Sequence, residues 1–274
     1  MRTGRAARRP GWVRPRPGPW RGEPQRGPER ALERTDGNGP PYLLRSGKER
    51  LTFWTLGLGE PPGVRSERLR HAPEGVWRAM DPFRSKLAAA LVKGVEFPPV
   101  RPGSATLYLG AASGTTATHV ADAVGREATV FAVEKSLRPF QQLLSVAQRY
   151  PNLIPLLEDA RSPQRYSPWV PRVDLICMDI PQGDQAGILE ANLSWFARPG
   201  TWVLLAVKLA SLPRREGATA RWEDVSPEFS RRMEVEDVTP LDPFHRKHVF
   251  VRGRVRGGGG GIPPITSRGG NRAG

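Results

Sequence analysis

The sequence predicts a doubly wound α/β domain with a largely parallel sheet, and three observations support this prediction. Five short runs are almost continuously apolar, as expected for strands that are covered on both faces. Helical patterns lie between several of these runs, and polar residues follow the runs directly. Because the carboxyl ends of parallel strands meet at one edge of a sheet, these polar residues should share one rim, where ligands bind in such folds. The five runs are 106–109, 129–133, 153–157, 173–178 and 202–207.

The first of these strands runs into a turn of small residues, Gly-Ala-Ala-Ser-Gly, at 110–114. A helix is expected to follow at once, because apolar residues recur at the spacing of one helical face. These apolar residues are Ala117, Val120, Ala121 and Val124. Gly125 then supplies a typical helix stop. A small-residue loop between a strand and its helix lets a nucleotide-like ligand lie against the backbone.

The remaining elements follow from the same kinds of pattern. Further helices are expected over 85–92, 136–150 with Ser136 as its N-cap, and 185–196. Two closing strands are expected at 235–238 and 249–252.

The details of the predicted rim favour S-adenosylmethionine over a dinucleotide. The turn holds two glycines, Gly110 and Gly114, where a dinucleotide-binding turn usually has three. Glu134 follows the second strand, at a place where an acid accepts hydrogen bonds from ribose hydroxyl groups. Asp159 and Ala160 follow the third strand and suit an acid-plus-backbone contact with an adenine edge. A closing pair of strands also recurs in class I methyltransferases.

Eight short blocks occur in a specific order along the chain. They are Arg-Ser-Lys-Leu-Ala-Ala at 84–89, Tyr-Leu-Gly-Ala-Ala-Ser-Gly-Thr-Thr at 108–116, Ala-Val-Glu at 132–134, Asn-Leu-Ile-Pro at 152–155, Asp-Ala at 159–160, Asp-Ile-Pro-Gln at 179–182, Ala-Val-Lys at 206–208 and His-Val-Phe at 248–250. With these blocks the chain resembles fibrillarin, the RNA 2′-O-methyltransferase of box C/D particles, most closely in its archaeal form. The resemblance covers roughly residues 83–252 and is fainter over 41–82, where the family has a small β-rich domain.

The resemblance implies a catalytic group of four residues, which are Lys86, Asp179, Lys208 and His248. The sequence itself supports this group in part, since Asp179 and Lys208 follow neighbouring apolar strands and should emerge at one rim. Lys86 falls in the first turn of the helix expected at 85–92, where the helix dipole disfavours a cation. A lysine at that position destabilises the helix, so its presence there favours a functional role.

Each of these residues also has a structural alternative. Lys86 and Lys208 could be solvated charges at the end of a helix or strand. Asp179 could cap the helix that begins near residue 184, and His245 could take the place of His248. His119, on the helix after the glycine turn, is expected to be a packing or surface residue.

The resemblance also implies which residues contact the cofactor. They are Gly110, Thr115, Thr116, Glu134, Lys135, Asp159, Ala160, Asp179, Ile180, Pro181 and Gln182. The family usually has an aromatic residue at position 135, lying along the adenine. The aliphatic stem of Lys135 is expected to cover the ring instead.

Composition divides the chain into four expected segments. Residues 1–40 hold ten arginines and four acidic residues, and residues 254–274 hold four arginines and no acid, so ten of the net +15 charges lie in these ends. Both ends are rich in Gly, Pro and Arg and are expected to be disordered. A small β-rich domain is expected at 41–82 and a methyltransferase domain at 83–253. The ends could attract RNA phosphates, or could be solubilising tails, and residues 1–40 could reflect a mis-assigned start codon.

Several functional classes are excluded by the sequence. No apolar run approaches the roughly 20 residues that span a bilayer, so no membrane association is expected. The single cysteine, Cys177, permits no internal disulfide and fits a reducing compartment. No Cys and His residues have the spacing of metal ligands, so no metal is expected.

Residues and resemblance together predict an RNA ribose 2′-O-methyltransferase that uses S-adenosylmethionine and takes part in rRNA and tRNA processing. The resemblance implies guide RNA, target rRNA or tRNA, a box C/D scaffold protein and a kink-turn-binding protein as partners. The expected location is the cytoplasm of an archaeal-type cell. Two alternatives stay open: an RNA-binding or assembly subunit with weak or lost catalysis, and a methyltransferase for protein or small molecules.

Overall fold

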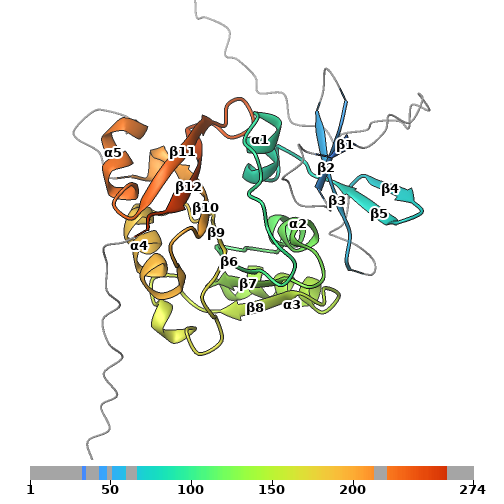
Figure 1. Cartoon of the computed structure of the whole chain (residues 1–274), viewed down its shortest axis with the longest axis horizontal. Helices are drawn as coiled ribbons and strands as arrows, with labels where there is room; N and C mark the ends of the chain where they lie inside the picture. The colour runs from blue at the N-terminus through green and yellow to red at the C-terminus, as the bar shows by residue number, and fades with distance from the viewer. Residues whose placement is uncertain (1–32, 35–42, 48–50, 60–66, 213–220, 258–274) are drawn as a thin grey trace, which may run out of the picture. The chain divides into compact units, whose positions relative to one another are not determined.

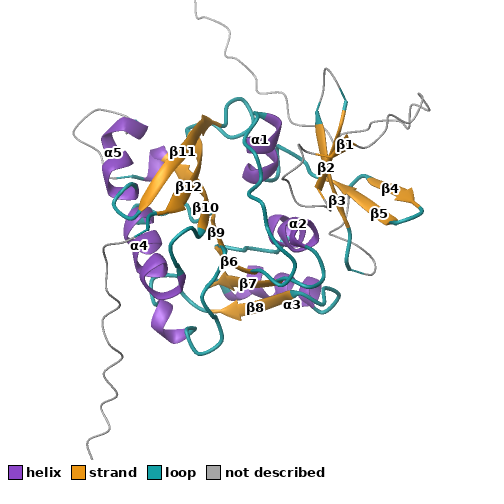
Figure 2. Cartoon of the chain, viewed as in Figure 1, coloured by secondary structure: helices purple, strands orange, loops and turns teal. Residues whose placement is uncertain are grey.

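The computed structural model describes residues 33–34, 43–47, 51–59, 67–212 and 221–257. Two sheets organise these residues: a five-stranded antiparallel sheet from the first strands of the chain and a seven-stranded, mostly parallel sheet from the later ones. Figures 1 and 2 show helices on both faces of the larger sheet. The doubly wound α/β fold that the sequence predicts is therefore confirmed.

The smaller sheet has the strand order β1-β2-β3-β5-β4, and every neighbouring pair is antiparallel. Its strands are β1 Glu33–Arg34, β2 Leu43–Ser46, β3 Thr52–Leu56, β4 Leu69–Ala72 and β5 Gly75–Ala79. β1 lies inside the segment 1–40 that was expected to be disordered, and the expectation is wrong for its two residues because they pair with Arg45 and Leu44 of β2. The rest of that segment lies outside the described residues.

The larger sheet has the strand order β11-β12-β10-β9-β6-β7-β8. Its strands are β6 Ala105–Leu109, β7 Thr129–Glu134, β8 Leu153–Leu157, β9 Leu175–Met178, β10 Trp202–Lys208, β11 Met233–Pro240 and β12 His248–Val255. The chain runs outward from β6 through β7 to β8 and then returns to β9, on the other side of β6. This reversal creates a crevice outside the carboxyl ends of β6 and β9, where ligands bind in open α/β sheets.

Side chains alternate between two buried layers along the central strands. Tyr108, Cys177 and Ala206 face a layer formed with the helices α1 Lys86–Val92, α2 Thr115–Val124 and α3 Leu137–Ala147. Their neighbours along the same strands face the opposite layer, which is formed with α4 Gln185–Phe196, α5 Trp222–Phe229 and Tyr166, directly after the short 3₁₀ turn Pro163–Arg165. Because both faces are covered, these strands are apolar along almost their whole length.

The element boundaries differ from the sequence-based expectations at a few points. The strand expected at 173–178 begins at Leu175, because the amide of Val173 donates to Phe196 at the end of α4 instead of to a strand neighbour. The helix expected at 136–150 ends at Ala147. The closing strands are longer than expected, and β12 extends two residues into the segment 254–274. Residues 258–274 lie outside the described part of the chain.

A buried polar cluster joins the smaller sheet to α2. Arg78 of β5 is fully buried and forms an ion pair with Asp122 of α2. Its guanidinium group also donates to Glu67 Oε2 at 2.9 Å, to the Tyr150 hydroxyl at 2.7 Å and to Thr118 Oγ1 at 3.1 Å. A buried guanidinium group is stable only when its donors are paired in this way.

His119 belongs to the same cluster and is a buried packing residue. Its Nδ1 lies 2.8 Å from Thr55 Oγ1 of β3, and its Nε2 lies 3.6 Å from Glu67 Oε1. Burial, reinforced by the charge of Arg78, lowers the pKa of His119 to about 4. The cluster therefore fixes α2, whose first turn follows the glycine loop, to the smaller sheet.

Among the described residues, no helix has both the length and the apolar character that a bilayer-spanning segment needs.

Candidate active site

Lys86 and Asp179 form an ion pair at the crevice between β6 and β9. Lys86 is the first residue of α1, and the Ser85 side chain caps this helix by accepting from the Ala88 amide at 3.2 Å. The Lys86 ammonium group lies 2.9 Å from Asp179 Oδ2, and the two side chains are 21% and 24% exposed. The carboxylate offsets the unfavourable helix dipole, and the partial exposure leaves the pair accessible from solvent.

Asp179 owes its position to the end of β9, in the middle of the sheet. Its amide donates to the Leu109 carbonyl at the end of β6, at 3.0 Å, which continues the ladder one residue beyond the strand. The N-cap position of α4 is held by Asp184. Asp179 therefore does not cap that helix, and this alternative is wrong.

Lys208 and His248 face each other on neighbouring strands. They are paired in the antiparallel register of β10 and β12, at the end of β10 that lies beside the crevice. The Lys208 amide donates to Gln185 Oε1 at 3.2 Å, which links the strand end to the first turn of α4. Burial lowers the pKa of His248, the Arg246 carbonyl opposes this shift, and the charges of Lys86, Asp179 and Lys208 also act on the ring. Lys86, Asp179 and Lys208 therefore all lie close enough to His248 for their charges to act on its ring.

His245 lies beside this group but has a different environment. Its ring centroid lies 6.0 Å from that of His248, at 68° between the ring planes. Burial, with the charge of Lys86, lowers its pKa. Its Nε2 is buried without a hydrogen-bond partner among the described residues, whereas His248 is paired across the sheet with Lys208.

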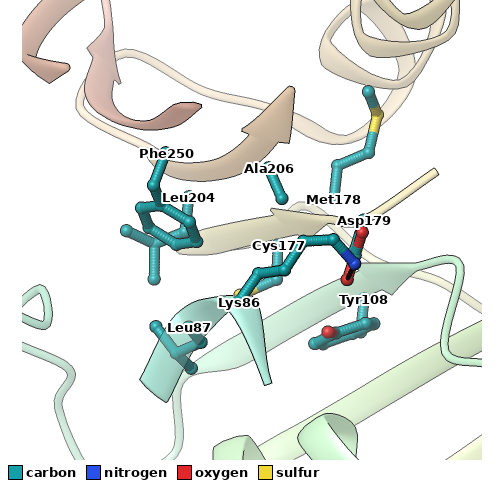
Figure 3. A pocket seen from close by; sticks show the side chains of 9 residues that line it. All are labelled: Lys86, Leu87, Tyr108, Cys177, Met178, Asp179, Leu204, Ala206 and Phe250. Carbon is teal, nitrogen blue, oxygen red and sulfur yellow. Dashed lines mark hydrogen bonds and ion pairs between the residues drawn. The ribbon is translucent and has the colours of Figure 1, made fainter. Parts of the chain in front are cut away.

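A small pocket extends from the ion pair toward the sheet. Besides the pair, it is lined by Leu87, Tyr108, Cys177, Met178, Leu204, Ala206 and Phe250. Figure 3 shows the Lys86 side chain crossing this pocket to reach Asp179, with the Tyr108 ring on the side of β6. Thr116 Oγ1, at the start of α2, donates to Ser85 Oγ at 3.2 Å. This contact connects the helix that follows the glycine loop to the turn that carries Lys86.

The loop after β6 packs closely against the residues that follow β9. Gly110 has a φ of +81°, and a Cβ there would lie 2.5 Å from the Asp179 carbonyl oxygen. Gly114 occupies the N-cap of α2 with no side-chain cap, and no acid lies in the first turn, which begins with Thr115 and Thr116. The helix therefore presents a positive end beside the crevice.

Glu134 holds this loop in place from the end of β7. Its Oε2 accepts from the Ala112 amide at 3.0 Å, and its Oε1 accepts from the Ser136 amide at 2.7 Å. Ala112 has a φ of +49°, an uncommon conformation that the first of these bonds helps to stabilise. Each carboxylate oxygen keeps acceptor capacity for a further partner.

The remaining expected contacts lie along the same rim. Asp159 accepts from the Arg161 amide at 3.0 Å, and Lys135 Nζ lies 3.9 Å from Asp159 Oδ2 with both side chains well exposed. The Ala160 carbonyl accepts from Asn192 at 2.8 Å, and the Ile180 carbonyl accepts from Gln185 at 2.6 Å. Gln182 accepts from Arg161, and Pro181 stands between Ile180 and Gln182.

This set of groups fits S-adenosylmethionine. A carboxylate at the end of β7 suits a ribose diol, a second at the end of β8 suits an adenine amino group, and the positive end of α2 suits the carboxylate of an amino acid. The glycines of the loop allow close packing within the protein, because a Cβ at Gly110 would meet Asp179 and a Cβ at Gly114 would meet Leu143.

The family model described as Fibrillarin matches residues 35–257 of the sequence. The chain belongs to the fibrillarin family. The match covers the larger sheet and strands β2 to β5 of the smaller one, so the resemblance found in the sequence is confirmed.

Individual members of the fibrillarin family agree with this assignment. A fibrillarin-like rRNA/tRNA 2′-O-methyltransferase of Pyrobaculum islandicum is 38% identical over 215 residues, which cover 77% of this chain and 91% of that protein. The crystal structure of Aeropyrum pernix fibrillarin with natively bound S-adenosyl-L-methionine has a TM-score of 0.71 and 34% identity, over 81% of this chain and 97% of that one. A structure of a fibrillarin/Nop5p complex has a TM-score of 0.64 and 37% identity, over 74% and 94%.

Beside the aliphatic and phenyl side chains of the pocket, Tyr108, Cys177 and Arg161 lie at the proposed site and were not assigned to it from the sequence. Tyr108 and Cys177 line the pocket, although Cys177 was expected only to fill the core. Strand alternation carries the missing signal, because both residues face the layer that contains α1. Arg161 has no such signal, since its contact with Gln182 joins two loops that are distant in the sequence.

Among the described residues, no group of three or more His, Cys, Asp and Glu side chains is arranged to hold a metal ion.

Proposed function

We propose that this chain is an RNA ribose 2′-O-methyltransferase that uses S-adenosylmethionine and modifies rRNA or tRNA. The observation that carries the proposal is the Lys86–Asp179 ion pair, set at the crevice between β6 and β9 in a chain of the fibrillarin family. Relatives of this chain bear the name rRNA/tRNA 2′-O-methyltransferase, and they share most of its length.

The cofactor supplies an electrophilic methyl group, and the residues of the chain supply the environment for its acceptor. A ribose 2′-hydroxyl group is a weak acid, so its oxygen needs stabilisation as it attacks. Lys86, held by Asp179 at 2.9 Å, places a fixed positive charge where negative charge develops on that oxygen. Lys208 adds a second positive charge from the end of β10.

His248 is suited to receive the proton of the hydroxyl group. Its Nδ1 lies 2.9 Å from the Arg246 carbonyl oxygen, which can only accept, so Nδ1 carries the hydrogen and Nε2 is left as the acceptor. The lowered pKa of His248 keeps the ring neutral near pH 7. Lys86, Asp179, Lys208 and His248 thus act together as the proposed catalytic group.

The proposed cofactor contacts follow the rim from β6 to β9. The loop at Gly110 and the first turn of α2, with Thr115 and Thr116, would hold the amino-acid end. Glu134 would accept from the ribose hydroxyl groups, and Asp159 with the Ala160 amide would contact the adenine edge. The remaining contacts come from Lys135 and from the segment 179–182.

The proposed setting is a box C/D guide-RNA particle. A related structure is a fibrillarin/Nop5p complex, which supports a scaffold protein of that kind as the partner of this chain. By the resemblance, a kink-turn-binding protein and a guide RNA complete the particle, and pairing with the guide selects the target nucleotide. The archaeal relatives favour the cytoplasm of an archaeal-type cell as its location.

Calorimetry followed by a substrate comparison tests this proposal. S-adenosylmethionine should bind the isolated chain, and labelled methyl groups should enter guide-paired RNA in preference to protein or small-molecule acceptors. Binding without transfer to any acceptor would favour an assembly subunit that has lost catalysis. Transfer to protein or small molecules alone would show that the substrate class is wrong.

A further inference from the structure

Thr118 connects the buried cluster around Arg78 to the first turn of α2. Its side chain is fully buried. Thr118 Oγ1 accepts from Arg78 Nη2 at 3.1 Å and donates to the Thr115 carbonyl at 3.0 Å. Thr115 is the first residue of the helix, directly after the glycine loop. Two consecutive hydrogen bonds therefore run from β5 of the smaller sheet to the helix end beside the crevice.

The directions of these two bonds follow from the chemistry of the groups. A guanidinium group can only donate, so the Thr118 hydroxyl group must accept from Arg78. Its single proton is then available for the Thr115 carbonyl, which can only accept. Hydrogen bonds that share a hydroxyl group polarise one another, so the charge of Arg78 strengthens the second bond.

The Thr115 carbonyl belongs to the same peptide group as the Thr116 amide. A hydrogen bond to a peptide carbonyl draws electron density from the nitrogen, which makes the amide a stronger donor. The amides of Thr115, Thr116 and Ala117 are the first three of the helix. Amides in these positions have no acceptor within the helix and are the donors that a helix offers to an anion. The Thr118 hydroxyl group therefore acts on the anion-binding end of α2.

The influence of Arg78 on this helix end is local, because its charge is balanced. Asp122 forms an ion pair with the guanidinium group, and Glu67 accepts from Nε at 2.9 Å and from Nη2 at 3.1 Å. Two carboxylates beside one cation leave no excess positive charge that could attract an anion over a distance. The contribution of Arg78 to the helix end must therefore pass through the Thr118 hydroxyl group.

We propose that Thr118, held by Arg78, is a positioning residue of the cofactor site, which sets the first turn of α2 to bind the carboxylate of S-adenosylmethionine. The smaller sheet would thus contribute to cofactor affinity through a buried hydrogen bond and not through a contact with the cofactor. This inference rests on the proposed function, because it extends the cofactor site proposed there.

Calorimetry with two ligands tests the proposal. S-adenosylmethionine and its decarboxylated analogue, which keeps the sulfonium and adenosine groups, are bound to the wild type and to Thr118→Val. The variant should fold, because Arg78 Nη2 still donates to Glu67 Oε1 at 3.1 Å. Its affinity for S-adenosylmethionine should fall about 2- to 10-fold, as expected when one hydrogen bond is lost. Its affinity for the decarboxylated analogue should equal that of the wild type.

The control variants separate this effect from a general loosening of the cluster. Thr55→Val removes another fully buried hydroxyl group, which contacts Asp122 Oδ2 at 3.0 Å and His119 Nδ1 at 2.8 Å, beyond the first turn of α2. It should lower the stability toward urea, as Thr118→Val does, but leave cofactor affinity unchanged. Thr118→Ser keeps the hydroxyl group and should bind S-adenosylmethionine like the wild type. Thr118→Ala is measured in parallel, with the same expectations as Thr118→Val.

The proposal is overturned if the variants without the Thr118 hydroxyl group bind S-adenosylmethionine like the wild type, or if their affinities for both ligands fall by the same factor. It is also overturned if Thr55→Val weakens cofactor binding as much, because loosening of the cluster would then explain the effect. Since the readout is cofactor binding, a chain that meets these expectations but transfers no methyl group to RNA would contradict the proposed function alone.

Discussion

Lys86 Nζ and Asp179 Oδ2 lie 2.9 Å apart although 93 residues separate them in the sequence. The contact exists because β9 pairs with β6, which brings the end of β9 beside the helix end at Lys86. An ammonium group at the N-terminal end of a helix is unfavourable alone, and the carboxylate makes it stable at the rim of the pocket.

The ion pair gives the first expected outcome. In Lys86→Met, turnover should fall by about 10²- to 10³-fold, the usual effect of removing one group that stabilises a developing negative charge. The affinity for S-adenosylmethionine should change little, because the proposed role of Lys86 is toward the acceptor. Calorimetry and single-turnover methylation separate the two effects. Lys93→Met, at the other end of α1, is the control for loss of a lysine. A large loss of cofactor affinity in Lys86→Met would place this lysine in the cofactor site instead.

The two amide contacts of Glu134 give the second expected outcome. Glu134→Ala should weaken cofactor binding by about 1.5–3 kcal/mol, since it removes a charged acceptor and frees the amides of Ala112 and Ser136. Calorimetry provides the measurement, and Glu127→Ala, an exposed acid before β7, provides the control. Equal cofactor affinity in the Glu134 variant and the wild type would show that Glu134 does not contact the cofactor.

Gly110 can be compared with Gly103, because the two glycines have nearly the same backbone conformation. Gly110 and Gly103 have φ values of +81° and +78°, but an added Cβ meets nothing within 4 Å at Gly103. Gly103→Ala should therefore lose only about 1–2 kcal/mol of unfolding free energy from backbone strain. Gly110→Ala should lose more, because its Cβ would lie 2.5 Å from the Asp179 carbonyl oxygen, and it should also weaken cofactor binding. Urea unfolding measures the stability difference, and similar losses in both variants would mean that β6 and β9 can separate freely at this point.

The buried imidazole of His119 makes stability depend on pH. Its pKa is lowered from 6.5 to about 4 in the folded protein, so below pH 6.5 the unfolded chain binds a proton that the folded chain does not accept. Its contribution is complete above pH 6.5 and is lost as pH falls toward 4, up to roughly 3 kcal/mol. His119→Asn should abolish this part of the pH dependence, and because His119 also lowers the pKa of Glu67, the two proteins are compared above pH 4.5, the ordinary pKa of that carboxyl group. His71→Asn, on exposed β4, should retain it. Parallel pH profiles of His119→Asn and the wild type in urea unfolding would contradict the assignment.

The sequence predicts the strands of the larger sheet well, because strands buried on both faces leave continuous apolar runs. It also predicts that Glu134, Asp179 and Lys208 follow strand ends, since each polar residue marks where burial stops. The sequence does not predict that Asp179 contacts Lys86, because that prediction would require knowledge of the order of the strands in the larger sheet.

The buried cluster around Arg78 could not be predicted from local patterns. Arg78 and Asp122 are charged residue types that are usually exposed, and their burial depends on each other across 44 residues of sequence. The link from Arg78 through Thr118 to the first turn of α2 could not be predicted for the same reason, because it joins residues that are 40 positions apart.

The central claim is that Lys86, Asp179, Lys208 and His248 act as one unit, and single-turnover methylation of guide-paired RNA tests it most directly. Rates are compared for the wild type, Lys208→Ala, Asp179→Ala and the double variant, at saturating S-adenosylmethionine. Each single variant should be far slower than the wild type, and the double variant should be no slower than the slower single one, because residues of one unit are not additive. Near wild-type methylation by Lys208→Ala, or losses that multiply in the double variant, would contradict the account.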